Sequence, residues 1–244
     1  MTFPKLFDPV LKNGVYPQWS AIEAIEFDHY LQQELEISPG LLMENAAHCL
    51  ATLVEHLLPV PAPRLLYLIG PGNNGGDAVV CLRQLHPKLT ESLYVWAPLG
   101  LPDLQPGPAG DATRTLKHLK IPIHTTPPSS DTGFNLIIDA LFGVGLSRPL
   151  SGAAANAVAY CQQLSVPSLA VDCPSGLDAT TGEILGICLA AQYTLSFVGP
   201  KAGFYRRKGP EVCGQVHVAQ IGVSAELACE WLELHRNSPM GSSI

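Results

Sequence analysis

The stretch LLYLIGPGNNGGD at residues 65–77 decides the fold. Its opening run, LLYLI, is apolar throughout, which is typical of a strand buried on both faces of a parallel sheet. A glycine-rich turn containing GxGxxG follows and leads into a helical segment, as in dinucleotide-binding folds, where the helix N-terminus offers free N–H groups to a phosphate. This pattern alone has low specificity. Asp77, expected in the first turn of that helix, could cap the helix or contact a ligand.

Outward from this stretch, short apolar runs ended by Gly or Pro alternate with helical segments. They predict a Rossmann-like three-layer α/β/α sandwich with a mostly parallel sheet. Two helices form a predicted N-terminal helical cap: Ser20 and Glu23 make a capping box before the first, and Ser38 starts a second that ends before Pro59. The expected strands are 65–69, 93–97, 123–125, 136–140, 168–172, 194–198 and 215–219, and the expected crossover helices are 75–85, 110–119 and 153–164.

The composition indicates one compact domain that does not bind polyanions. Hydrophobic residues make up 47% of the 244 residues, enough for a sizeable core, and the net charge of −7 argues against nucleic-acid binding. We predict a single domain over residues 1–236 and a disordered tail over 237–244. Seven cysteines without a CxxC pair indicate a reducing compartment, so the expected location is the cytoplasm. No apolar run approaches the roughly 20 residues that cross a bilayer.

Two further oxygen-rich loops follow apolar runs. Asp139 precedes ALFGVGLSRP, and Asp172 begins DCPSGLD. A carboxylate that closes a buried strand is costly unless it is paired or coordinates a cation, and open α/β sheets bind ligands beyond the carboxyl ends of their strands. Each residue alone has a plainer explanation: Asp139 and Ser175 could form turns, and Arg148 could make a surface ion pair instead of binding a phosphate.

The second predicted strand argues against an ordinary NAD-dependent dehydrogenase. The acidic residue that binds a ribose should end this strand, but the run at 93–97 ends in Ala97, and Pro98 follows. None of the eight histidines falls at a zinc-like spacing.

Four motifs in order resemble one family. GPGNNGGD (70–77), DALFGVGLSRP (139–149), VDCPSGLDATTG (171–182) and FVGPKAGFY (197–205) are similar to the loops of NAD(P)H-hydrate epimerases, the YjeF N-terminal-domain family. GLLMENAA (40–47) is similar to a helix of that family's N-terminal cap. The resemblance covers residues 22–222, and four ordered motifs are far more specific than one short pattern. One departure is Ala78, where the family usually has Gly, and its methyl group could narrow a pocket.

The resemblance implies an isomerase that interconverts the R and S forms of hydrated NADH or NADPH, so that a separate dehydratase can restore the cofactor. It also implies a homodimer formed through the N-terminal helices. A potassium ion is expected at Asn74, Asp139 and Ser175. The substrate-contacting residues that the resemblance implies are Asn73, Asn74, Gly75, Gly76, Asp77, Gly143, Val144, Gly145, Leu146, Ser147, Arg148, Pro149 and Asp172.

Two residues at predicted strand ends are candidates for the acid/base chemistry of such a reaction. Inverting a hydroxyl-bearing carbon requires proton transfer at the oxygen as it leaves and returns, so an acid/base group must lie within hydrogen-bond reach. Asp172 is the first candidate. Lys201, which could donate a proton or hold a phosphate, is the second.

Two other functions stay open at this point. Relatives with the same fold serve as non-catalytic dimeric modules associated with nucleotides or RNA, although the intact NNGGD motif, Asp139 and Asp172 argue against that role. Kinase or dehydratase activity would need the separate C-terminal domain of fused relatives, and the residues after Gly222 are expected to be too few to form one.

Overall fold

The structure is a computed structural model that describes residues 16–58, 63–89, 93–102, 107–129 and 132–238. Among these residues, no helix combines the length and apolarity needed to span a membrane. The helices and strands are α1 (Ala21–Gln33), α2 (Pro39–Leu57), β1 (Leu65–Ile69), α3 (Asn73–Leu89), β2 (Leu93–Trp96), α4 (Pro108–His118), β3 (Ile123–His124), β4 (Leu136–Ala140), α5 (Gly152–Gln163), β5 (Ser168–Val171), β6 (Tyr193–Phe197), the 3-10 helix η2 (Ala202–Tyr205), α6 (Gly209–Val212), β7 (Gln215–Ala219) and α7 (Ala225–Asn237).

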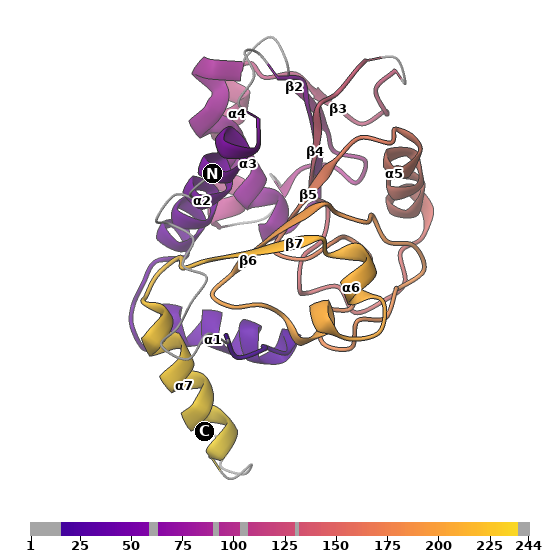
Figure 1. The fold of residues 1–244 in the computed structure, drawn as a ribbon. Coiled ribbons are helices and arrows are strands. Elements are labelled where there is room, and N and C mark those ends of the chain that lie inside the picture. Colours follow the sequence, from indigo (N-terminus) through magenta and orange to yellow (C-terminus); the bar gives the residue numbers. More distant parts are fainter. Residues whose placement is uncertain (1–15, 59–62, 90–92, 103–106, 130–131, 239–244) are drawn as a thin grey trace.

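The seven strands form one parallel sheet in the order β3-β2-β1-β4-β5-β6-β7. Parallel neighbours need crossover connections, and the helices in these crossovers cover the sheet. Figure 1 shows α2, α3 and α4 on one face and α5 and α6 on the other. The predicted three-layer α/β/α sandwich is therefore confirmed.

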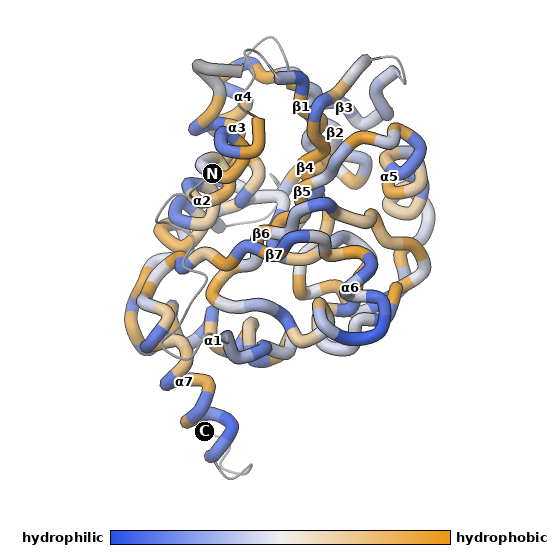
Figure 2. The backbone as a smooth tube through the Cα atoms, viewed as in Figure 1, coloured by the Kyte–Doolittle hydropathy of each residue, from blue (hydrophilic) through white to orange (hydrophobic). Residues whose placement is uncertain are grey.

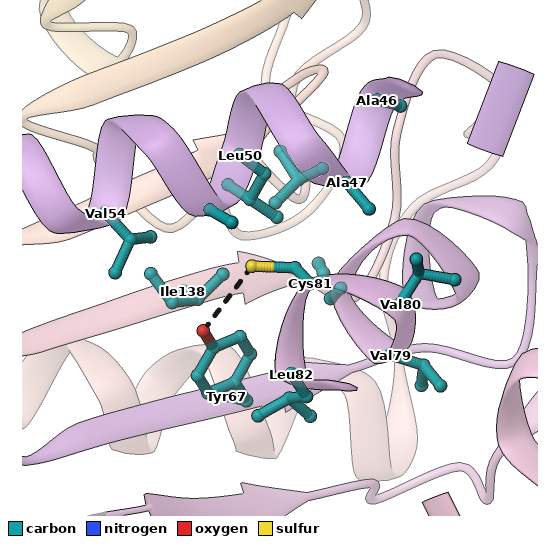
Figure 3. Packing of buried hydrophobic residues seen from close by; sticks show 14 of the residues in the cluster. Ala46, Ala47, Leu50, Val54, Tyr67, Val79, Val80, Cys81, Leu82 and Ile138 are labelled. Atoms are coloured by element: carbon teal, nitrogen blue, oxygen red, sulfur yellow. Dashed lines mark hydrogen bonds between the residues drawn. The ribbon is translucent and has the colours of Figure 1, made fainter. Parts of the chain in front are cut away.

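Strand β1 shows why both faces of the sheet are covered, because all its residues are buried. Leu65 and Tyr67 pack into a core with α2 and α3, whereas Leu66 and Leu68 pack with α5, as the two-residue repeat of a strand requires. In Figure 3 the Tyr67 hydroxyl lies 3.7 Å from the Cys81 Sγ, so this polar atom has a partner inside the core. Figure 2 shows the apolar residues gathered along the central strands.

The predicted strands are confirmed to within one residue at each end, and both N-terminal helices are present. One prediction was wrong, and one helix was missed. Helix α3 begins at Asn73, so Asp77 lies in its second turn and not in its first. Helix α7 was not predicted, and it includes Asn237, the first residue of the expected disordered tail. Residues 239–244 of that tail lie outside the described residues.

Helix α1 lies outside the three layers, below β6 and beside α7 in the view of Figure 1. Trp19, which precedes it, forms a parallel bridge with Lys201 in the segment after β6. The predicted capping box is present: the Ser20 hydroxyl accepts from Glu23 N at 3.1 Å, and the Glu23 carboxylate accepts from Ser20 N at 2.7 Å. The helix therefore begins at a point fixed to the sheet.

Leu50→Ala should lower the free energy of unfolding by about 2–5 kcal/mol, because it removes a fully buried side chain of α2 and leaves a cavity. Urea unfolding followed by circular dichroism measures the loss. Leu234→Ala is the matched control: this leucine is 70% exposed on α7, and its loss should cost at most about 0.5 kcal/mol. Equal losses in the two variants would contradict the described core.

Candidate active site

A cavity lies where the strand order reverses beside β1. The chain passes from β1 to β2 and β3 on one side and then returns to β4 on the other, so the loops after β1 and β4 diverge. Open α/β sheets bind ligands at such a point, beyond the carboxyl ends of the strands. The cavity has a volume of about 570 Å³, which suits a small-molecule ligand. Its lining comes from α1, α2, the first two turns of α3 and the start of α4, and from the loops after β1, β4, β5, β6 and β7.

The structure places most of the predicted substrate-contacting residues around this cavity. Gly75 and Gly76 are buried inside α3, whereas Ser147, Arg148 and Pro149 are exposed, and these five do not line it. Their contact with a substrate stays a prediction. The residues that do line the cavity are Asn73, Asn74, Asp77, Gly143, Val144, Gly145, Leu146 and Asp172.

The Asp172 carboxylate is paired with a buried ammonium group. Lys201 Nζ lies 2.9 Å from Asp172 Oδ1, and only 2% of the Lys201 side chain is exposed. The same Nζ lies within 3.2 Å of Ser196 Oγ and of the carbonyl oxygens of Phe197 and Gly199. An ammonium group has three protons, so these acceptors leave none for a substrate. This geometry suits a residue that positions Asp172, and proton donation by Lys201 stays a prediction.

The backbone at Asp172 turns its side chain toward the neighbouring loop. Its φ of 63° is in the left-handed region, which residues other than glycine adopt at a cost and which is common at functional sites. A Cβ atom at Gly143 would lie 3.3 Å from Asp172 Oδ2 and 3.2 Å from Asn74 Oδ1. Glycine at position 143 therefore lets two polar side chains approach one stretch of backbone. The start of α3 and the loops after β4 and β5 meet at this point.

Asp139 and Ser175, two of the three expected potassium ligands, contact each other. Ser175 Oγ donates to Asp139 Oδ1 at 2.6 Å, and Ser175 N donates to Oδ2 at 2.9 Å. Burial raises the pKa of Asp139 to about 6, although these hydrogen bonds act in the opposite direction. The third residue, Asn74, has a buried amide whose nitrogen and oxygen both lack a hydrogen-bond partner among the described residues. Such an amide is costly to bury unless a ligand satisfies it.

Two more carboxyl groups, those of Asp77 and Asp28, line the cavity with Asp172. Burial raises the pKa of Asp77 well above its usual range, and the charges of Asp172 and Asp28 raise it further. Burial also raises the pKa of Asp28; Asp172 adds to this rise, while His29 and Gln32 oppose it. Asp28 was not among the residues predicted from the sequence. The signal that could have found it is the pair of polar side chains, Asp28 and Gln32, one turn apart on a helix.

Ala78, the departure from the family pattern, does not narrow the cavity. Its side chain is fully buried in the hydrophobic core between α3 and the sheet, and the residue is not part of the cavity lining. Because alanine favours a helix over glycine by about 1 kcal/mol, the methyl group suits this position.

Known proteins resemble this chain over most of its length. The family described as YjeF-related protein N-terminus matches residues 40–203. The chain belongs to this family. A protein named NAD(P)H-hydrate epimerase from Rhodopirellula baltica is 31% identical over 226 residues, which cover 91% of this chain and 90% of that relative. The bifunctional NAD(P)H-hydrate repair enzyme Nnr of Dictyoglomus turgidum is 32% identical over 86% of this chain, and the match spans 41% of that longer relative.

A solved structure has the same fold as this YjeF-family chain. The crystal structure of yeast ynu0, YNL200c, superposes with a TM-score of 0.71 at 22% identity and covers 93% of this chain and 97% of the yeast chain. The family match begins at the start of α2 and ends in η2, so it contains the cavity loops after β1, β4, β5 and β6. Helices α1 and α7 lie outside the matched residues.

Asp77→Asn should stabilise the protein increasingly as the pH rises. The pKa of Asp77 in the folded state lies well above the usual 3.8, so above about pH 4 the folded protein holds a proton that the unfolded chain has lost. The wild type should therefore lose about 1.4 kcal/mol of unfolding free energy per pH unit until the folded-state pKa is reached, whereas asparagine stays neutral. Urea unfolding at pH 4 and pH 8 measures this. The matched control is Glu230→Gln, which removes an exposed charge on α7 and should leave that pH dependence unchanged. If Asp77→Asn and the wild type differed by the same unfolding free energy at both pH values, the raised pKa of Asp77 would be contradicted.

Proposed function

We propose that this protein is an NAD(P)H-hydrate epimerase, an isomerase that interconverts the R and S forms of hydrated NADH and NADPH in cofactor repair. The observation that carries the proposal is the Asp172 carboxylate, ion-paired with Lys201 and set in the cavity that the family's motif loops form. The names of relatives that match about 90% of this chain favour an epimerase over a non-catalytic binding module.

The geometry at Asp172 suits proton transfer at a hydroxyl group. Inversion requires the hydroxyl to gain a proton as it leaves and the returning water to lose one. Lys201 holds Oδ1 of the carboxylate, while Oδ2 lies toward Gly143 in the cavity wall. One oxygen is thus fixed and the other is placed to exchange a proton. Leu141, Phe142 and other apolar residues of the lining limit the water around a bound ring.

Asp172→Asn should slow epimerisation by about 100-fold or more, because asparagine cannot exchange a proton. The rate at which one epimer of hydrated NADPH equilibrates with the other, followed by chromatography, measures the effect. Asp111→Asn provides the control, since it removes an exposed carboxylate on α4 and should keep the wild-type rate. An Asp172→Asn variant with full activity would exclude Asp172 as the acid/base group.

We also propose that Asn74, Asp139 and Ser175 hold a potassium ion. The unpartnered Asn74 amide supports this, and the Asp139 carboxylate has lone pairs beyond those that Ser175 uses. Among the described residues, no group of three His, Cys, Asp or Glu side chains could hold a metal ion, so the donors are mixed oxygens, which suit a hard cation. The ion would connect the start of α3, the end of β4 and the loop after β5, and it would add a positive charge beside the cavity.

Potassium should raise the free energy of unfolding by about 1 kcal/mol when its concentration is roughly five times its dissociation constant. The measurement compares thermal unfolding in potassium chloride and in choline chloride at equal ionic strength. Asn74→Ala should remove the increment, because it deletes the amide oxygen. Asn156→Ala, an exposed change on α5, should retain it. A potassium increment that survives in Asn74→Ala would argue against this site.

We also propose a homodimer, a cytoplasmic location and a separate dehydratase, three features that the family implies. A homodimer formed through the N-terminal helices is supported by Ile22, Ile25 and Leu41, whose apolar side chains are exposed on α1 and α2. The seven cysteines are all free, which supports a cytoplasmic location. The bifunctional repair relative is much longer than this chain, which supports a separate dehydratase as the partner activity.

A further inference from the structure

Helix α1 forms the wall of the cavity that faces the sheet edge. Ala24, Asp28 and Gln32 line the cavity at a spacing of four residues, which places them on one face of the helix. Ile25, His29 and Leu31 of the same helix also line the cavity, and Phe27 is buried in the core beside it. Asp28 is the carboxyl group on the cavity face, so α1 adds one acidic side chain to a site that the sheet loops otherwise form.

The start of α1 is attached to the segment that holds Lys201. Trp19 makes backbone hydrogen bonds to the residues on both sides of Lys201, at 2.9 and 2.7 Å. A Cβ atom at Gly199 would overlap the Trp19 indole nitrogen, so this close approach requires glycine. Since Lys201 also holds Asp172, one short segment fixes the positions of both α1 and Asp172.

Helix α7 holds the other side of α1. Trp231 stacks on Trp19 with ring centroids 6.0 Å apart, and Arg236 Nε donates to the Glu23 carboxylate at 2.6 Å. Contacts with the sheet edge and with α7 leave α1 little freedom to move. The place of Asp28 in the cavity wall is therefore set by packing.

The surroundings of Asp28 and Asp172 differ in charge. Asp172 forms an ion pair with the Lys201 ammonium at 2.9 Å. Asp28 Oδ2 accepts from Gln32 Nε2 at 2.6 Å, and no lysine or arginine of the described chain pairs with it. Burial and the facing charge of Asp172 raise the pKa of Asp28, whereas His29 on the same helix lowers it. Two carboxyl groups with such different surroundings are suited to act as an acid and a base.

Asp77 is less suited than Asp28 to this role. Burial and the charges of Asp172 and Asp28 raise its pKa well above the usual range, so Asp77 holds its proton more tightly than an ordinary carboxyl group. The pKa of Asp28 is raised as well, but the charge of His29 and a hydrogen bond from Gln32 oppose that rise. A residue that alternates between acid and base has to release its proton as well as take one up, which suits Asp28.

We propose that Asp28 is a second catalytic residue, which serves the face of the substrate carbon opposite to Asp172; this rests on the epimerase function proposed above. In one direction the Asp28 acid gives its proton to the hydroxyl group. The C–O bond breaks, its electron pair leaves with the oxygen as water, and the lone pair of the adjacent ring nitrogen forms a C=N bond.

Water then adds to the opposite face of the same carbon. The new C–O bond takes its electron pair from the water oxygen, the C=N pair returns to the nitrogen, and the Asp172 carboxylate takes the proton. One proton has left Asp28 and one has reached Asp172, so atoms and charges balance. The reverse reaction exchanges the two roles.

Asp28→Asn in the full chain tests this assignment. With one epimer of hydrated NADPH as substrate, kcat should fall about 100-fold or more, while KM changes by less than about three-fold. The pH profile of kcat/KM should change shape in the variant, because Asp28, which lies in the cavity with Asp77, Asp172 and Lys201 and beside His29 on α1, no longer titrates. Asp28→Glu retains an acid and should recover part of kcat. Glu34→Gln, exposed at the end of α1, is the charge-matched control and should behave as the wild type.

Several outcomes would overturn the proposal. Asp28→Asn with more than about a third of the wild-type kcat, or with only KM raised, would exclude a catalytic role. Inversion in heavy-oxygen water without uptake of a labelled oxygen would exclude the leaving-water step. Should Asp28→Asn fail to fold, as judged by circular dichroism, Asp28→Ser carries the same prediction. A wild type that does not accelerate epimerisation would refute the proposed function and this inference together, whereas an active wild type with an active Asp28→Asn would refute this inference alone.

Discussion

The ion pair between Lys201 and Asp172 is the interaction on which the rest of the site depends. An ammonium group that is 2% exposed costs several kcal/mol to bury unless a charge and hydrogen bonds compensate it. Here Asp172 supplies the charge, and three oxygens from β6 and its following turn complete the shell. The backbone on either side of Lys201 also holds Trp19. One buried cation therefore fixes the Asp172 side chain, two strand ends and the beginning of α1.

The sheet could be predicted from the sequence because a strand buried on both faces is an unbroken apolar run, as in LLYLI at β1. The helix boundaries were harder to predict than the strands. The start of α3 contains Asn-Asn-Gly-Gly, which local propensity assigns to a loop, and packing against the core overrides that preference. Helix α7 was missed although its signals are in the sequence. Ser224 accepts a hydrogen bond from Leu227 N as its N-cap, and Ala228 and Leu232 are buried at a spacing of four.

Much of the site could be predicted because its residues follow apolar strands, but the wall that α1 forms could not. Asp139 and Asp172 stand directly after apolar runs, and parallel strands bring such residues to one edge, where Asp139 meets Ser175. The place of Asp28 depends instead on contacts between residues far apart in the chain, such as Arg236 with Glu23. The polar pair Asp28 and Gln32 is a signal in the sequence, but a polar stripe on a helix is ordinarily a solvated face, so this signal alone does not distinguish a cavity wall from a surface.

The contact between Trp19 and Trp231 gives the protein an internal optical reporter. The chain contains three tryptophans, and two of them share this contact, in which the rings lie within 4° of parallel. The Trp19 side chain is 1% exposed. A shielded indole emits at shorter wavelengths than one in water, so any movement that separates α1 from α7 shifts the emission of the intact, unlabelled protein to the red. The fluorescence spectrum thus records whether the helix that carries Asp28 is seated on the sheet edge.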